Sequence, residues 1–191
     1  MKKVISSILI ICIGLLIITG CEKKDKGSIE KMKEQLEQQN GGTSSSKIQS
    51  TDDLNNKSGL LTCTREATAE GDLKPYFSYV VTYKDGYLLR IHSIEKVSSE
   101  SGTGLDAYYD AYVNINKKYE GLDGYNSQVN KTNTSVTRDT IIDYENIDTA
   151  KLLEIEGSEN NIINSKGKAS LNKWLTLATK FGTKCSEGGT M

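Results

Sequence analysis

Residues 76–97, YFSYVVTYKDGYLLRIHSIEKV, decide the fold that this sequence predicts. The stretches 76–83 and 87–97 are rich in the β-branched and aromatic residues that favour strands. Between them, Asp85-Gly86 readily adopts the positive φ angles of a type I′ turn, so we expect a β-hairpin. Counting outward from the turn gives the expected cross-strand pairs, which are Tyr83 with Leu88, Val81 with Arg90, Tyr79 with His92, and Phe77 with Ile94. One face of this hairpin is therefore mostly apolar.

The segments on either side of this hairpin extend the pattern. Residues 60–64 suit a preceding strand. After the hairpin, residues 104–119 have helical periodicity, and the apolar side of this helix consists of Leu105, Tyr108, Tyr109, Tyr112, Val113 and Tyr119. A second hairpin is expected from residues 125–129 and 135–144.

Two further helices are expected towards the C-terminus. Asp148 is placed to cap a short helix and Ser170 to cap a last one, which Gly182 ends. The last helix repeats apolar residues at helical spacing: Leu171, Trp174, Leu175, Ala178 and Phe181. The order of elements is βββ-α-ββ-α-α. It predicts an α+β fold in which an antiparallel sheet of about five strands is packed by helices on one face.

The N-terminus has the pattern of a bacterial lipoprotein signal peptide. Lys2-Lys3 form a short cationic end, and an uncharged apolar run covers residues 4–18. Ile18-Thr19-Gly20-Cys21 is a lipobox, in which small residues precede the cysteine that is acylated. A transmembrane anchor is the alternative, but the apolar run is shorter than the ~20 residues that span a bilayer. We expect residues 1–20 to be a signal peptide and Cys21 to carry the lipid.

Residues 21–57 are expected to form a largely disordered stalk. The segment has few apolar residues, no aromatic residue and a middle rich in glycine and serine. Ile29, Met32 and Leu36 recur at helical spacing, so a short helix that docks on a partner is the alternative. The globular domain is expected over residues 58–191, an ordinary size for one domain.

The four cysteines separate by position. Cys12 lies in the signal peptide and Cys21 carries the lipid, which leaves Cys63 and Cys185 in the exported domain. Because no glutathione pool keeps thiols reduced outside the cytoplasm, we expect a disulfide between these two residues. Two buried free thiols are the alternative.

Several short strings resemble the YehR-like family of bacterial lipoproteins. They follow the lipobox and a three-strand start, and they are Lys118-Tyr119-Glu120-Gly121, Asp123-Gly124, Ile142-Asp143-Tyr144 and Ile147-Asp148. The resemblance covers residues 60–156 and implies a small α+β lipoprotein domain, with no catalytic residue to carry over. The long stalk and Cys185 depart from the pattern of this family.

Charge and motifs exclude several classes of function. The chain has 24 basic and 25 acidic residues, and without residues 1–20, which hold two lysines and no acid, its formal charge is −3. No basic run stands clear of acids, whereas a protein that binds nucleic acid needs a basic face. The sequence has no phosphate-binding glycine loop, HExxH, CxxC, GxSxG or EF-hand loop. We therefore expect no catalytic residues, no cofactor, no metal site and no nucleic-acid partner.

Arg90 and His92 are the candidate ligand-contacting residues. His92 is the single histidine of the chain, and a pH-sensitive or ligand-contacting role beside Arg90 is weighed against an ordinary place in a strand. The ten tyrosines offer contact surface for sugars, peptides or proteins, although the helical spacing of those in 104–119 favours packing on the sheet. The acids of residues 139–148 alternate with apolar residues, as on a solvated strand face, and binding of a divalent ion there is an alternative.

The expected function is that of a non-enzymatic lipoprotein. The lipid on Cys21 holds it on the extracytoplasmic face of the cell membrane, where its domain binds an envelope protein or a small ligand. One alternative is an envelope enzyme that uses His92, Arg90 or the acidic strand. Another is a structural envelope component, which predicts a flat apolar patch and no pocket.

Overall fold

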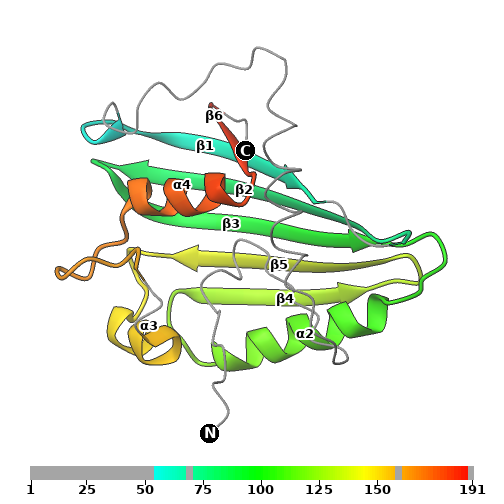
Figure 1. The fold of residues 1–191 in the computed structure, drawn as a ribbon. Helices are drawn as coiled ribbons and strands as arrows, with labels where there is room; N and C mark the ends of the chain where they lie inside the picture. Colours follow the sequence, from blue (N-terminus) through cyan, green and yellow to red (C-terminus); the bar gives the residue numbers. More distant parts are fainter. Residues whose placement is uncertain (1–53, 68–70, 158–160, 189–191) are drawn as a thin grey trace, which may run out of the picture.

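The computed structural model describes residues 54–67, 71–157 and 161–188 (Figure 1). The elements in chain order are β1 (Ser58–Glu66), β2 (Lys74–Lys84), β3 (Tyr87–Ser98), α2 (Leu105–Lys118), β4 (Tyr125–Lys131), β5 (Ser135–Asp143), α3 (Thr149–Glu156), α4 (Leu171–Lys180) and β6 (Lys184–Glu187). The expected signal peptide, Cys21 and the stalk up to residue 53 lie outside the described residues.

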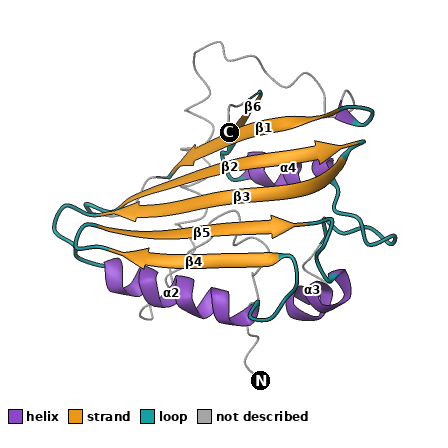
Figure 2. Ribbon diagram, turned by 180° about the vertical axis from the view of Figure 1, so that it is seen from behind, coloured by secondary structure: helices purple, strands orange, loops and turns teal. Residues whose placement is uncertain are grey.

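The strands form one six-stranded sheet in the order β4-β5-β3-β2-β1-β6, and every neighbouring pair is antiparallel. Figure 1 shows α4 in front of β2 and β3, with α2 and α3 at the β4 end of the sheet, and in the view from behind α4 lies beyond the strands (Figure 2). Buried and more exposed residues alternate along β2, β3 and β5, as a sheet with one covered face requires. The predicted α+β architecture is confirmed.

The hairpin of β2 and β3 has the predicted turn but a different register. Asp85 and Gly86 have φ angles of 51° and 76°, and Tyr83 pairs with Leu88 as expected. A β-bulge then shifts the ladder by one residue, because Leu89 of β3 is not paired with a residue of β2. The other three expected pairs are therefore wrong, since the observed pairs are Val81 with Ile91, Tyr79 with Ser93, and Phe77 with Glu95.

The bulge decides which side chains of β3 lie under the helices. Because side chains alternate along a strand, a shift of one residue exchanges the two faces. Ser93 and Glu95 are buried on the covered face, each 1% exposed, whereas Arg90 and Ile94 are exposed on the other face. His92 lies between those two residues on the face that carries no helix among the described elements.

The predicted helices form close to their expected bounds. Asp148 accepts a hydrogen bond from the backbone N–H of Lys151 and begins α3, and Ser170 accepts one from Lys173 and begins α4. In α2, the buried residues are Leu105, Tyr108 and Tyr112, which lie on the expected apolar side.

The buried side chains form two clusters. The larger one packs Trp174, Leu175 and Ala178 of α4 against β1, β2 and β3, and the smaller one packs α2 on Val97 and Val136. The larger cluster also includes Leu54, which is 1% exposed although the sequence placed it in the stalk. The packed core therefore begins before residue 58.

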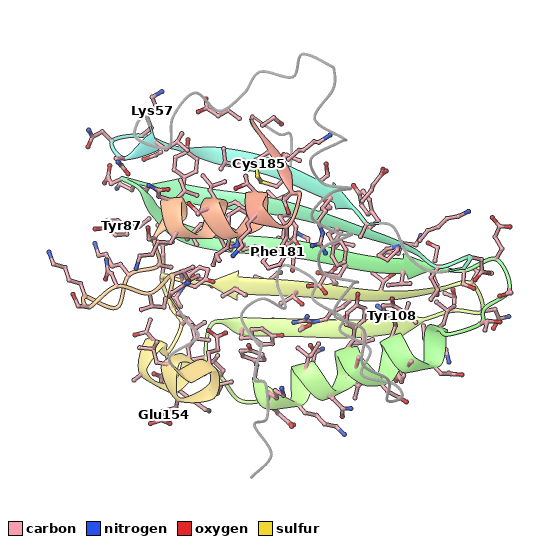
Figure 3. The ribbon with its side chains drawn as sticks, viewed as in Figure 1. Lys57, Tyr87, Tyr108, Glu154, Phe181 and Cys185 are labelled. Atoms are coloured by element: carbon pink, nitrogen blue, oxygen red, sulfur yellow. A yellow bond between two sulfur atoms is a disulfide. The ribbon has the colours of Figure 1, made fainter. Side chains whose placement is uncertain are left out.

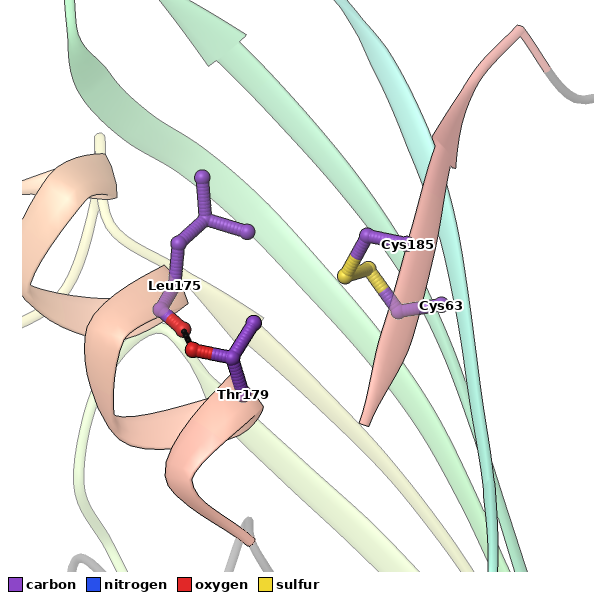
Figure 4. Close-up of a disulfide and its surroundings, with 4 residues drawn as sticks. All are labelled: Cys63, Leu175, Thr179 and Cys185. Carbon is purple, nitrogen blue, oxygen red and sulfur yellow. Dashed lines mark hydrogen bonds between the residues drawn. A yellow bond between two sulfur atoms is a disulfide. The ribbon is translucent and has the colours of Figure 1, made fainter. Parts of the chain in front are cut away.

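The strand β6 was not predicted. It pairs with Leu61–Thr64 of β1 and places Cys185 directly opposite Cys63. The two sulfur atoms are 2.07 Å apart and form a disulfide, beside the last turn of α4, where Thr179 donates a hydrogen bond to the carbonyl of Leu175 (Figure 4). The four residues of β6 have little strand propensity of their own, so their pairing depends on the neighbouring β1.

Candidate functional site

A row of three charged side chains and one aromatic ring crosses the helix-covered face of the sheet. The strand register places Arg65, Phe77, Glu95 and Arg138 side by side on β1, β2, β3 and β5. Glu95 and Arg138 are each 1% exposed, and Nη1 of Arg138 donates to Oε1 of Glu95 over 3.4 Å. The guanidinium of Arg65 lies 4.0 Å from the centre of the Phe77 ring. Charged groups thus occupy the interior of the sheet, where apolar side chains are usual.

Burial changes the acidity of these groups. Loss of hydration raises the pKa of Glu95, although the positive charges of Arg138 and Arg65 oppose this shift. Burial lowers the pKa of Arg65. The pKa of Tyr112 lies well above the ordinary tyrosine value, first because of burial and second because of the negative charge of Glu95. The Glu95 carboxylate therefore depends on its arginine neighbours to stay charged.

Arg138 connects this row with the α2 side of the molecule. Its Nε donates to Oδ1 of Asn116 over 3.0 Å, and its Nη2 donates to the hydroxyl of Tyr125 over 2.9 Å. The Tyr125 hydroxyl donates in turn to Oδ1 of Asn116 over 3.4 Å. Asn116 comes from α2, Tyr125 from β4 and Arg138 from β5, so three elements meet in one polar network.

Aromatic stacking continues this network towards α3. The rings of Tyr119 and Tyr125 are stacked, with their centres 4.6 Å apart. The hydroxyl of Tyr119 donates to Oε1 of the buried Glu156 over 2.9 Å. The C-terminal end of α2 is thereby held against both β4 and α3.

A pocket of about 540 Å³ lies beside this network, and we call it the α2–β4 pocket. Its lining residues are Val113, Asn116, Lys117, Tyr119, Glu120, Gly121, Tyr125, Asn126, Ser127 and Val129. The volume is within the usual range of sites for small ligands, about 300–1,000 Å³. The wall is mixed: two valines, two tyrosines, two asparagines and one pair of opposite charges.

Asn116 gives the pocket an oriented hydrogen-bond donor. An arginine Nε can only donate, so the Asn116 atom that it contacts must be the oxygen. The amide nitrogen Nδ2 of Asn116 then has no hydrogen-bond partner among the described residues, although the side chain is partly exposed. The pocket can bind a polar ligand that offers an acceptor, whereas its lining residues include no histidine and no pair of carboxylates for acid–base chemistry.

A second pocket, of about 650 Å³, lies between the β2–β3 turn and the segment before α4. Tyr87, Tyr144, Lys84 and Lys168 are among its lining residues, and Nζ of Lys168 lies 4.9 Å from the centre of the Tyr87 ring. None of the residues that line it belongs to the buried polar network of Arg138.

Arg90 and His92 lie apart from both pockets. They are neighbours on the helix-free face, where Nε2 of His92 and Oδ1 of Asp139 are 2.8 Å apart. The tyrosines of α2 lie on the opposite face of the sheet, and Figure 3 shows Tyr108 between α2 and the strands. The structure therefore brings His92 to one acid of the expected acidic strand, but it does not place Arg90, His92 and the tyrosines around one concavity.

Sequence reasoning missed the residues of the polar network. Arg138 does carry a signal, because in β5 it falls in phase with Val136, Thr140 and Ile142, the side that is buried. A charged residue in the apolar phase of a strand indicates a buried polar partner. Glu95, that partner, could not be assigned to the covered face without the bulge at Leu89.

The described residues contain no group of three or more histidine, cysteine, aspartate or glutamate side chains that could hold a metal ion. In the same part of the chain, no helix is both long and apolar enough to cross a membrane.

Comparison with protein-family models gave no match, and comparison with curated proteins gave none either. Among solved structures, the chain is similar to the NMR structure of the Escherichia coli YehR protein, with a TM-score of 0.48 and 16% identity over 71% of this chain and 95% of that one. It is also similar to the NMR structure of a protein from Streptococcus pneumoniae TIGR4, with a TM-score of 0.42 and 12% identity over 92% of this chain and 100% of that one. Neither name states a ligand, a partner or an activity.

Proposed function

We propose that this chain is a lipoprotein of the cell membrane, anchored on the extracytoplasmic face through a lipid on Cys21, and that its folded domain binds a ligand or a partner in the α2–β4 pocket. The lipobox Ile18–Cys21 supports the anchor. The site has no catalytic constellation, so the proposed role is binding and not catalysis.

One observation carries the binding proposal: the donor Nδ2 of Asn116 lies at a pocket of ligand size and is held there by Arg138. Arg138 is itself fixed by Glu95 and by Tyr125, so the donor is oriented before a ligand arrives. A pre-oriented donor loses little conformational entropy on binding, which favours affinity.

We also propose that the chain belongs with the YehR-like lipoproteins. The string Lys118-Tyr119-Glu120-Gly121, which resembles this family, supplies three residues of the pocket wall, Tyr119, Glu120 and Gly121. The proposal rests on this string and on the other strings of residues 123–148, together with the lipobox.

The experiment is a thermal-shift screen of the mature lipoprotein in detergent, with separate sets of polar metabolites and peptides, followed by calorimetric titration of any compound that binds. The decisive variant is Asn116→Asp, which keeps the oxygen that accepts from Arg138 and replaces the donor. Asn114→Asp is the matched control, because it adds the same charge to an exposed position of α2.

We expect Asn116→Asp to weaken binding about tenfold or more, because a lost hydrogen bond that leaves a polar group unpaired costs about 1–3 kcal/mol. Asn114→Asp should leave affinity unchanged. A screen without any binder, or binders that ignore Asn116→Asp, would refute a binding function for this pocket.

An envelope enzyme is the second candidate, and the contact of His92 with Asp139 is the observation that favours it. A carboxylate that orients a histidine is a common part of acid–base sites. This candidate predicts a hydrolytic activity that His92→Ala abolishes and Asn116→Asp leaves unchanged.

A further inference from the structure

Among the described strands, β4 is the outermost at one end of the sheet, and it pairs only with β5. The backbone bonds from Asp143 N–H to the Gly124 carbonyl and from Thr132 N–H to the Ser135 carbonyl fix the phase of this pairing. In an antiparallel ladder every second residue bonds to the neighbour, so Asn126, Gln128 and Asn130 face β5. The backbone groups of the intervening residues point away from the sheet.

These outward-facing residues are Ser127, Val129 and Lys131. Their outward N–H and carbonyl groups have no backbone partner among the described residues. A row of three donors and three acceptors is a template for a further strand.

The edge of β4 that has no strand partner among the described residues borders the α2–β4 pocket. Ser127 and Val129 of β4 line the pocket, together with Val113, Asn116 and Lys117 of α2. Figures 1 and 2 both show α2 running beside β4 at this end of the sheet. The result is a site bounded by one helix and one unpaired strand edge.

We propose that the occupant of the α2–β4 pocket is an extended peptide segment of a partner protein, which adds to β4 as a further strand. This inference rests on the proposed binding function. Backbone bonds to Ser127, Val129 and Lys131 supply affinity, and alternate side chains of the peptide point into the pocket. A small aliphatic side chain there contacts Val113 and Val129, while a neighbouring peptide carbonyl accepts from Nδ2 of Asn116.

A single segment fits this edge better than a second copy of the chain. A second copy that paired through its own β4 would bring its own α2 beside the same edge, where the first α2 already lies. One added strand needs a width of only about 4.8 Å.

The probe is a phage-displayed library of random heptapeptides, selected on the mature lipoprotein in detergent. The selected peptide is synthesised with a single backbone N-methyl group at each position in turn, and the affinity of each version is measured by fluorescence anisotropy. We expect a period of two: methylation at alternate positions weakens binding at least tenfold, and methylation at the positions between has little effect.

The matched change in the protein is Val129→Pro. It removes one outward N–H and leaves the backbone bonds to β5 in place, and an edge strand tolerates proline at such a position. Val129→Ala, which keeps the N–H, is its control. We expect Val129→Pro to weaken binding at least tenfold and Val129→Ala to do so much less. If Val129→Pro does not fold, as judged by circular dichroism, the N-methyl series on the unchanged protein decides.

Four outcomes overturn the inference. A methylation pattern without a period of two excludes strand addition. Polar metabolites that bind in an Asn116-dependent way, with no peptide selected, contradict a peptide occupant and leave the proposed function standing. Absence of any binder refutes both. A concentration-dependent dimer that Val129→Pro dissociates would assign the edge to a second copy.

Discussion

Arg138 joins the interior of the sheet to the rim of the pocket. One side of its guanidinium contacts Glu95, and the other contacts Asn116 and Tyr125. The side chain is 1% exposed, so the whole group has exchanged water for these partners. Replacement of a whole buried ion pair by apolar residues is often neutral for stability, whereas removal of one partner is costly.

Removal of one partner of this pair should destabilise the fold strongly. Arg138→Met leaves the Glu95 carboxylate buried with less positive charge around it, and we expect a loss of about 3–5 kcal/mol in the free energy of unfolding. Urea denaturation followed by circular dichroism measures it. The double variant Glu95→Leu with Arg138→Met should lose much less than the sum of the single losses, and simple additivity would contradict the coupling.

Asp72 offers a test by pH. It accepts hydrogen bonds from the Ser99 hydroxyl and from the Ser101 N–H, and the latter bond is the main reason why the pKa of Asp72 is lowered. Because the folded state favours the carboxylate, its contribution to stability is present above the ordinary aspartate pKa of about 3.9. It is lost as the pH falls through the lower pKa of the folded state.

The measurement is an NMR titration of the Asp72 carboxyl carbon and the Ser101 amide in acid. Both should titrate together with a midpoint below the ordinary value. In Asp72→Asn the titration of the Ser101 amide should disappear, and a midpoint above the ordinary value would show that the hydrogen bonds do not favour the charged form.

At the scale of elements, β3 decides how the site is built. One unpaired residue at Leu89 turns Glu95 towards the helices and His92 away from them. Without this bulge the same sequence would place His92 beneath the helices and Glu95 in water. A local irregularity in one strand thereby sets the chemistry of both faces of the sheet.

The pairing of β6 with β1 should depend on the disulfide. The bridge joins residues 122 positions apart, and for a loop of this length the chain-entropy model gives about 5 kcal/mol of stabilisation. The double variant Cys63→Ser with Cys185→Ser should therefore unfold at a lower temperature, measured by calorimetry. In hydrogen exchange of this double variant, the amides of β6, which has only four residues, should lose protection before those of the other strands.

Thiol labelling is the control for that experiment. In the unreduced protein neither Cys63 nor Cys185 should react with a maleimide, and after reduction both should. Labelling of both residues without reduction would contradict the disulfide.

At the scale of the whole molecule, the two edges of the sheet differ in what they carry. The disulfide joins β1 and β6 at one edge, and the α2–β4 pocket lies at the opposite edge. The larger cluster extends from α4 to Tyr119 and Tyr125 at the pocket, and the smaller cluster reaches the pocket through Val129. A ligand in the pocket would therefore contact residues of both clusters.

The proposed lipid anchor lies in the N-terminal part of the full chain, so its test uses the full chain. Cells that express the full chain with a clickable fatty acid should show a labelled band in the membrane fraction. Cys21→Ala should abolish this label, because in the proposed anchor the thiol of Cys21 accepts the lipid. Persistent labelling of the Cys21→Ala variant would contradict the proposed anchor.

Local sequence patterns determined the elements of this protein. Alternating strands, the Asp85-Gly86 turn, the apolar side of α2 and the caps Asp148 and Ser170 all depend on residues a few positions apart, and the structure contains each of them. Interactions of this range can be read from one sequence, because the spacing of neighbours fixes their geometry.

Contacts between distant residues were decided only by the tertiary structure. The bulge at Leu89, the pairing of β6 and the network of Glu95, Arg138 and Asn116 depend on strands and helices that meet across the fold. The exact register of a strand pair and the partners in a side-chain network depend on how several elements pack at once. For this reason the β2–β3 hairpin was predicted from the sequence, whereas the α2–β4 pocket was not.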